Sequence, residues 1–200
     1  MPGRRPGKES RPPYRFCWSC HVAILPIRVY PDPVLRKQAQ PVTVIDAKLR
    51  QLAADMVETM QNAEGVGLAA PQVGESIRMV IVDFNPEEGD PRVLINPVVT
   101  KRSGKKELRK EGCLSFPGLH TPIKRSPVVI CEAQNLDGEI VEYRAEGLAA
   151  RAVQHELDHL DGLLFVDKAG PSDKQSIQPE LEEMEDVYDE LHPAEARGRE

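Results

Sequence analysis

Apolar residues recur every three to four positions over about residues 47–62, which is the spacing of one face of an α-helix. Asp46 stands immediately before this stretch, where its carboxylate can accept hydrogen bonds from the free amides of a first helical turn. We therefore predict a helix here, with one buried stripe formed by Leu49, Leu52, Ala53, Met56, Val57 and Met60.

Short apolar runs separated by turn residues predict a β-rich middle of the chain. A glycine-rich segment over 65–74 is expected to form a loop, and strand-like runs follow it. Residues 135–138, Asn-Leu-Asp-Gly, separate the last two runs and have the composition of a tight turn, so these runs predict an antiparallel hairpin. The strand-like runs cover residues 79–82, 93–95, 128–131 and 139–143.

A second helix is predicted over about 148–161. Gly147 precedes it, and Gly162 follows it at the position where helices commonly end with a left-handed residue. The tail beyond Gly170 predicts a third helix over about 179–191, which its many acidic residues indicate to be a solvated appendage. Strands that precede a late helix indicate an α+β fold.

Charge is distributed unevenly and indicates three parts. Residues 1–21 contain five basic residues and one acid, whereas residues 171–200 contain three basic residues and ten acids. We expect an unstructured extension over 1–21, one globular domain over 22–170 and an acidic tail over 171–200. The chain has no basic stripe and no apolar run near the roughly 20 residues of a membrane span, so neither direct nucleic-acid binding nor a membrane is expected.

The cysteine content and the N-terminal residues predict a cytoplasmic protein. Four cysteines in 200 residues are too few for a disulfide framework, so free thiols are expected. The apolar stretch over 22–25 ends at Pro26, which makes it too short for a secretory signal. Prolines within 1–21 also disfavour the amphipathic helix of a transit peptide.

The strongest chemical signal is His155-Glu156-Leu157-Asp158-His159. Two imidazoles one helical turn apart lie on one face, so both can bind a single metal ion. The alternative is an exposed helix face that carries two histidines by chance. This alternative does not explain why Glu156 stands where a metal-bound water would need a general base. The motif predicts a metal-dependent hydrolase.

Residue spacing alone leaves the third metal ligand open. A zincin-type protease would take a downstream carboxylate, and His192 is the only other downstream histidine. The upstream alternative is Cys113, within Glu111-Gly112-Cys113-Leu114-Ser115, although a buried cysteine is by itself most often simple packing. The downstream carboxylates at suitable spacing are Glu180, Glu182 and Glu183.

Three segments together resemble the peptide deformylase family, in order and in spacing. They are residues 65–72 (Gly-Val-Gly-Leu-Ala-Ala-Pro-Gln), 111–115 (Glu-Gly-Cys-Leu-Ser) and 154–159 (Gln-His-Glu-Leu-Asp-His). Residues 27–36 are similar to the family's opening, so the resemblance covers roughly 22–170. It implies an α+β fold in which antiparallel β-sheets pack around a central HExxH helix, with an N-terminal helix and a C-terminal helical tail.

The resemblance also implies a reaction and the residues that perform it. The reaction is removal of the formyl group from the N-terminal formylmethionine of nascent polypeptides, with release of formate. Cys113 would join His155 and His159 as a metal ligand, and Glu156 would serve as general base. The implied donors to the developing oxyanion are the side-chain amide of Gln72 and the backbone amide of Leu114.

Recognition of methionine requires an apolar pocket beside the metal. Leu148 and Ala152 precede His155 by seven and three residues and share its helical face. Val66 is expected to add a wall, and Gly67 permits close approach of the substrate backbone. These residues are equally compatible with ordinary core packing. Glu111 is a candidate to orient neighbouring ligands, with an exposed carboxylate as the alternative.

The metal and the cellular partners follow from the same resemblance. One sulfur and two nitrogens would first favour zinc. The resemblance instead implies Fe²⁺, with zinc, nickel or cobalt as substitutes. N-formylmethionyl nascent peptides are the expected partners, which places the protein transiently near the ribosome, although RNA would repel the acidic tail.

Two further interpretations compete with a functional deformylase of this length. Residues 17–21, Cys-Trp-Ser-Cys-His, match the attachment pattern of a c-type haem. Haem attachment normally requires export, which the sequence does not indicate. The alternatives are a zinc-binding turn or a dispensable extension translated from a misassigned start. An inactive relative kept as a binding module is disfavoured because every residue of the implied machinery is present.

Overall fold

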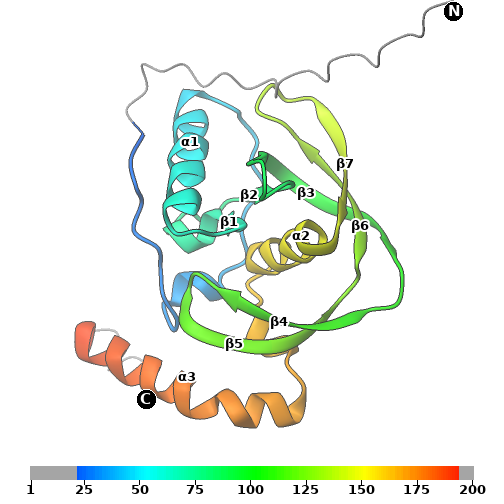
Figure 1. The fold of residues 1–200 in the computed structure, drawn as a ribbon. Helices are drawn as coiled ribbons and strands as arrows, with labels where there is room; N and C mark the ends of the chain where they lie inside the picture. Colours follow the sequence, from blue (N-terminus) through cyan, green and yellow to red (C-terminus); the bar gives the residue numbers. More distant parts are fainter. Residues whose placement is uncertain (1–21, 194–200) are drawn as a thin grey trace, which may run out of the picture.

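The computed structural model of the protein describes residues 22–193. In this range seven strands form two antiparallel sheets (Figure 1). A five-stranded sheet has the order β1-β2-β3-β6-β7, and β4 and β5 form a separate hairpin. The strands are β1 Gly67–Ala69, β2 Met79–Asp83, β3 Pro91–Ser103, β4 Glu107–Cys113, β5 Phe116–Arg125, β6 Val128–Gln134 and β7 Ile140–Glu146.

The helices follow the predicted order. The α-helices in residues 22–193 are α1 Ala47–Asn62, α2 Gly147–Leu160 and α3 Pro171–Leu191, and the short 3-10 helices are η1 Pro33–Arg36, η2 Ala70–Val73 and η3 Phe165–Lys168. The predicted cap of α1 is confirmed, since the Asp46 carboxylate accepts a hydrogen bond from the Leu49 amide at 2.9 Å. Gly162 follows α2 with a φ of 70°, in the left-handed region that glycine adopts without strain.

The predicted hairpin is formed by β6 and β7, which pair along their whole length. The Asn135 side chain organises the turn by accepting hydrogen bonds from the amides of Asp137 and Glu139. By contrast, the glycine-rich segment is not simply a loop, because it contains β1, which pairs with β2, followed by η2. Its apolar residues Leu68, Ala69 and Ala70 are fully buried, and burial favours paired backbone there.

Strand β2 is covered on both faces. Val80 and Val82 share a core cluster with residues of α2, whereas Met79 and Ile81 share another with residues of α1. Successive side chains of a strand point to opposite faces, so α1 and α2 lie on opposite sides of this part of the sheet. Helix α2 also contacts β1, β6 and β7. The helix that carries the HExxH motif is therefore held by a continuous apolar core.

Helix α3 differs from the predicted appendage. It begins at Pro171, eight residues earlier than expected, and continues through Pro179. Ile177 is 7% exposed and belongs to a core cluster with Phe116 and Phe165. The prediction of a solvated helix was wrong because an apolar stripe at intervals of three and four residues was hidden by the acidic composition. This stripe comprises Ile177, Leu181, Met184 and Tyr188.

Some expectations concern residues that the structure does not describe. The extension over 1–21, including the Cys17-Cys20-His21 pattern, lies outside the described range. Within that range Cys113 and Cys131 are free thiols, as expected. None of the helices described over 22–193 combines the length and the apolar character required to cross a bilayer.

Candidate active site

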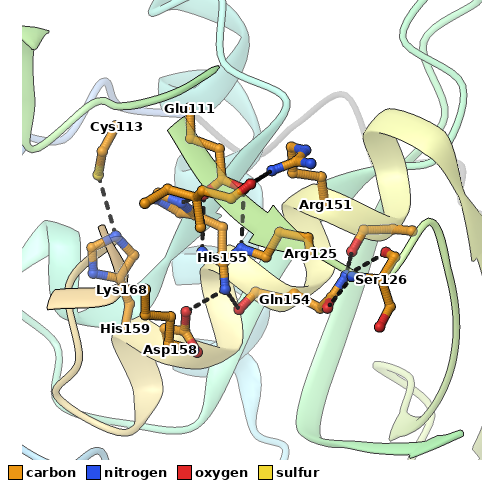
Figure 2. A network of polar contacts seen from close by, with 12 residues as sticks. Glu111, Cys113, Arg125, Ser126, Arg151, Gln154, His155, Asp158, His159 and Lys168 are labelled. Carbon is orange, nitrogen blue, oxygen red and sulfur yellow. Dashed lines mark hydrogen bonds and ion pairs between the residues drawn. The ribbon is translucent and has the colours of Figure 1, made fainter. Parts of the chain in front are cut away.

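Two elements far apart in the sequence supply the candidate metal ligands. His155 and His159 lie one turn apart on α2, and Cys113 ends β4 beside the turn into β5. The Cys113 Sγ lies 3.3 Å from the His159 Nε2 (Figure 2). One ligand atom from each residue lies within 4.8 Å of the others, and no other such group occurs among residues 22–193. The spacing is suitable for a single metal ion.

The downstream carboxylates are not part of this group. Glu180, Glu182 and Glu183 lie on α3, and the cluster of potential ligands in the described chain contains none of them. Glu180 and Glu183 instead border a neighbouring groove between α3, residues 26–32 and β5. The geometry therefore favours Cys113 over a zincin-type third ligand.

Glu156 is a buried carboxylate beside the candidate ligands. The residue is 4% exposed, and its Oε2 has no hydrogen-bond partner among the described residues. Burial raises the pKa of Glu156 to about 7, although His155 and Arg125 act in the opposite direction. A buried oxygen without a partner is unusual in a folded protein. Its presence beside one sulfur and two nitrogen donors fits a site that accommodates a cation and a water molecule.

The two histidines have different surroundings. The His155 Nδ1 lies 3.2 Å from the Glu111 Oε2. Burial lowers the pKa of His155, but Cys113 and Glu111 outweigh this effect and raise the pKa well above its ordinary value. Burial, reinforced by the charge of His155, lowers the pKa of His159 well below its ordinary value. A carboxylate at Nδ1 fixes the orientation of an imidazole and directs its Nε2 outward.

Glu111 lies in the interior and not on the surface. Burial raises the pKa of Glu111, but hydrogen bonds from His155 and Arg125 outweigh this effect and lower the pKa to about 2. Arg151 also donates to its Oε1 at 2.5 Å. The interpretation of Glu111 as a simple exposed carboxylate is therefore wrong.

Gln72 has two sets of contacts. Its Oε1 accepts a hydrogen bond from the Ala69 amide at 2.8 Å, which ties η2 to β1. Its Nε2 lies 3.2 Å from the Ser115 Oγ and 3.4 Å from the Cys113 Sγ. The side chain thus stabilises its own segment through the Ala69 amide and also directs a donor at the candidate site.

A cavity of about 530 Å³ opens onto these residues. All four residues predicted for the substrate pocket line it, and Leu148 is 53% exposed at its edge. His159 does not belong to the lining and is almost fully buried. The predicted residues that line the cavity are Val66, Gly67, Gln72, Cys113, Leu114, Leu148, Ala152, His155 and Glu156.

Sequence reasoning missed several polar residues of the lining, including one each on α2, β4 and β5. Arg151 lies one helical turn before His155, and this spacing was the available signal for it. Lys110 precedes the Cys113 motif on β4 without a distinctive pattern. His120 lies on β5, and only the pairing of β4 with β5 brings it to the cavity.

The two antiparallel sheets, the Cys-His-His group and the carboxylate beside it define a candidate metal-dependent hydrolase. A family model described as polypeptide deformylase matches residues 24–175. The peptide deformylase of Dictyoglomus thermophilum is 54% identical over 143 residues, which cover 72% of this chain and 91% of that protein. The chain belongs to the peptide deformylase family. It is an enzyme that removes the formyl group from nascent peptides.

Solved structures agree with this membership. Peptide deformylase 1B of Arabidopsis thaliana superposes with a TM-score of 0.80 at 38% identity, over 84% of this chain and 93% of that chain. The enzyme of Thermotoga maritima gives a TM-score of 0.70 at 46% identity, over 76% of this chain and 100% of that chain. The antiparallel sheets and the helices, including the C-terminal helix, therefore represent the fold of this family.

Proposed function

We propose that deformylation takes place in the cavity beside α2, with Cys113, His155 and His159 holding a divalent metal ion and Glu156 moving the proton. The observation that carries this proposal is the convergence of three ligand atoms within 4.8 Å next to a buried carboxylate oxygen that has no hydrogen-bond partner in the described part of the chain. The cavity gives a peptide access to this point.

The donor set fits a divalent transition metal. One thiolate and two imidazoles suit zinc and also first-row metals such as Fe²⁺, nickel and cobalt. We propose Fe²⁺ because the three motifs resemble a family that commonly uses iron. When bound, the cation would supply the Lewis acidity that makes a water molecule nucleophilic near neutral pH. Anaerobic purification with metal analysis tests this choice, and full air-stable activity with zinc alone would contradict it.

Glu156 would transfer the proton. This residue lines the cavity beside the ligands, and among residues 22–193 its buried Oε2 has no hydrogen-bond partner that would compete for a proton. The proton taken from water would then pass to the departing amine of the peptide. Burial keeps competing solvent away from this carboxylate.

Gln72 and Leu114 would stabilise the negative charge that grows on the formyl oxygen. The Gln72 Nε2 is held near Cys113 by Ser115, so its direction is set before substrate binds. Preorganised donors of this kind lower the barrier because no reorientation is needed during the reaction. Val66, Gly67, Leu148 and Ala152 would enclose the methionine side chain.

The cellular setting is also part of the proposal. We propose a cytoplasmic enzyme that acts on formylmethionyl peptides while they are close to the ribosome. The catalytic domain would cover 22–170, between an extension over 1–21 and an acidic tail over 171–200, whose helix α3 packs on the domain through Ile177. In this arrangement the HExxH helix is the centre around which the antiparallel sheets pack.

Formate release from a formyl-Met peptide tests the proposed chemistry. Glu156→Ala should lose about 10²-fold to 10⁴-fold in kcat while the metal is retained, because a general base contributes in this range. Cys113→Ser should lose the metal. Glu183→Gln, on the exposed side of α3, is the control and should match the wild type. Retained metal and endopeptidase activity in Cys113→Ser would instead indicate a protease.

A further inference from the structure

The metal ligands are supplied by two elements that no β-ladder joins. Cys113 belongs to the β4–β5 hairpin, which is separate from the five-stranded sheet. His155 and His159 belong to α2, which packs on that larger sheet. Backbone hydrogen bonding within either unit therefore does not set the distance from the thiol to the imidazoles.

A buried chain of charged side chains crosses between these two units. Arg125 on β5 has a side chain that is 4% exposed. Its Nε and Nη2 donate to the two carboxylate oxygens of Glu111 on β4 at 3.0 and 2.9 Å (Figure 2). Its Nη1 donates to Asp158 on α2 at 2.5 Å and to the Gln154 carbonyl at 3.3 Å. One guanidinium thus connects the hairpin to the HExxH helix.

The two carboxylates that Arg125 contacts, Glu111 and Asp158, each have a further basic partner. Lys168 in η3 donates to the second oxygen of Asp158 at 2.5 Å. Arg151 on α2 donates to Glu111 and to the Ile123 carbonyl, at 2.5 and 3.0 Å. The rotamers of Glu111 and Asp158 are therefore each fixed from two directions.

The two carboxylates flank the ligands. Glu111 precedes Cys113 by two residues and contacts the His155 Nδ1, and Asp158 immediately precedes His159. We propose that Arg125 is a positioning residue that fixes the hairpin against α2, and with it the spacing of Cys113 from both histidines, before any metal binds. This inference rests on the proposed function, because it assumes that these three residues hold the metal.

The planar guanidinium is the feature that this role requires. Arginine can bind one carboxylate with two parallel hydrogen bonds and still donate to a second acceptor, whereas the ammonium of lysine is a point charge without this fixed fork. Arg125→Lys keeps the buried charge and most of the volume, so it isolates geometry from charge. Arg125→Gln removes the charge and leaves Glu111 and Asp158 each with one fewer partner.

Metal affinity of the folded protein is the decisive measurement. The metal-free wild type, Arg125→Lys and Arg125→Gln are titrated with Zn²⁺ against a competing chelator, well below the unfolding temperature of each. We expect affinity to fall about 10-fold to 100-fold in Arg125→Lys, the range typical of outer-shell partners, and further in Arg125→Gln. The rate of Zn²⁺ release to the chelator should rise in parallel.

Arg109→Gln is the matched control. Arg109 lies on β4 and pairs with Glu107, but both side chains are exposed, so its substitution should leave Zn²⁺ affinity unchanged. Equal affinity of the wild type and Arg125→Lys, with only a lower unfolding temperature in the variant, would show that Arg125 stabilises the fold without positioning the ligands. If the wild type and Arg109→Gln bound neither Zn²⁺ nor Fe²⁺, this result would contradict the proposed metal site itself and not only the role of Arg125. Should Arg125→Gln not fold, Arg125→Lys alone decides.

Discussion

Gly67 faces the carboxyl group of Glu156 at a distance that leaves no room for a side chain. A Cβ atom built on Gly67 would lie 2.9 Å from the Glu156 Cδ and closer still to its Oε1. The glycine of β1 and the acid of α2 come from segments that lie side by side, and both line the candidate cavity. The absence of a side chain at residue 67 therefore leaves the space that the buried carboxylate occupies.

Gly67→Ala should impair catalysis through this contact. The added methyl group would displace the Glu156 carboxylate, and a displacement of about 1 Å at a catalytic group can cost about 100-fold in rate. Formate release under saturating peptide measures kcat. Gly170→Ala is the control, since its Cβ would approach only the Asp173 carboxylate, at 3.1 Å, on α3. Wild-type kcat in Gly67→Ala would contradict the assigned position of Glu156.

Leu148→Ala should weaken binding of formyl-Met peptides. Leu148 lines the cavity but is about half exposed, so we expect KM to rise several-fold, at most about tenfold, because the three carbons removed are only partly buried, whereas one methylene enclosed in an apolar pocket is worth about tenfold or more. Leu163→Ala, at a similarly exposed leucine that does not line the cavity, should leave KM unchanged. Unchanged kinetics in a folded Leu148→Ala protein would exclude Leu148 from the pocket.

Ile177→Ala should destabilise the whole domain. The side chain is 7% exposed among residues from β5 and η3, and truncation of such a core residue costs about 2–5 kcal/mol. Leu191→Ala, on the same helix but 71% exposed, should change the free energy of unfolding by less than about 0.5 kcal/mol. Urea denaturation of the metal-free protein compares the two. If both substitutions changed the free energy of unfolding equally, α3 would be an appendage and not part of the core.

The contact between Tyr30 and Glu185 should make stability depend on alkaline pH. Burial and the hydrogen bond to Glu185 raise the pKa of Tyr30 from 10.0 to about 12, with Asp167 adding to the shift and Arg36 opposing it. The unfolded chain releases the phenol proton at lower pH than the folded chain does. The stabilisation is therefore fully present below about pH 10 and is lost as pH rises toward 12.

Tyr30→Phe separates this contribution from the rest of the alkaline transition. Phenylalanine keeps the stacking on Phe116 but has no proton to lose and no donor for Glu185. The difference in unfolding free energy between wild type and variant should be constant from pH 7 to about 9 and then shrink up to pH 12. A difference that does not change with pH would refute the role of the phenol.

The sequence determined the local elements and the identity of the chemical groups. The period of the apolar residues located α1, because one face of this helix is buried, and the flanking glycines Gly147 and Gly162 located α2. The Asn-Leu-Asp-Gly turn located the β6–β7 hairpin. The HExxH spacing placed two imidazoles and a carboxylate on one helix, since helical geometry alone fixes residues that are one turn apart.

Contacts between distant segments depended on how the whole chain packs. The choice between Cys113 and the acids of α3 required the β4–β5 hairpin to be placed against α2. The burial of α3 and the pairing within the glycine-rich segment depended on which apolar surfaces remained to be covered. The bridge from Glu111 through Arg125 to Asp158 joins three elements whose side chains carry no periodic signal. Local spacing encodes neighbours within one element, whereas long-range proximity arises from packing the whole core.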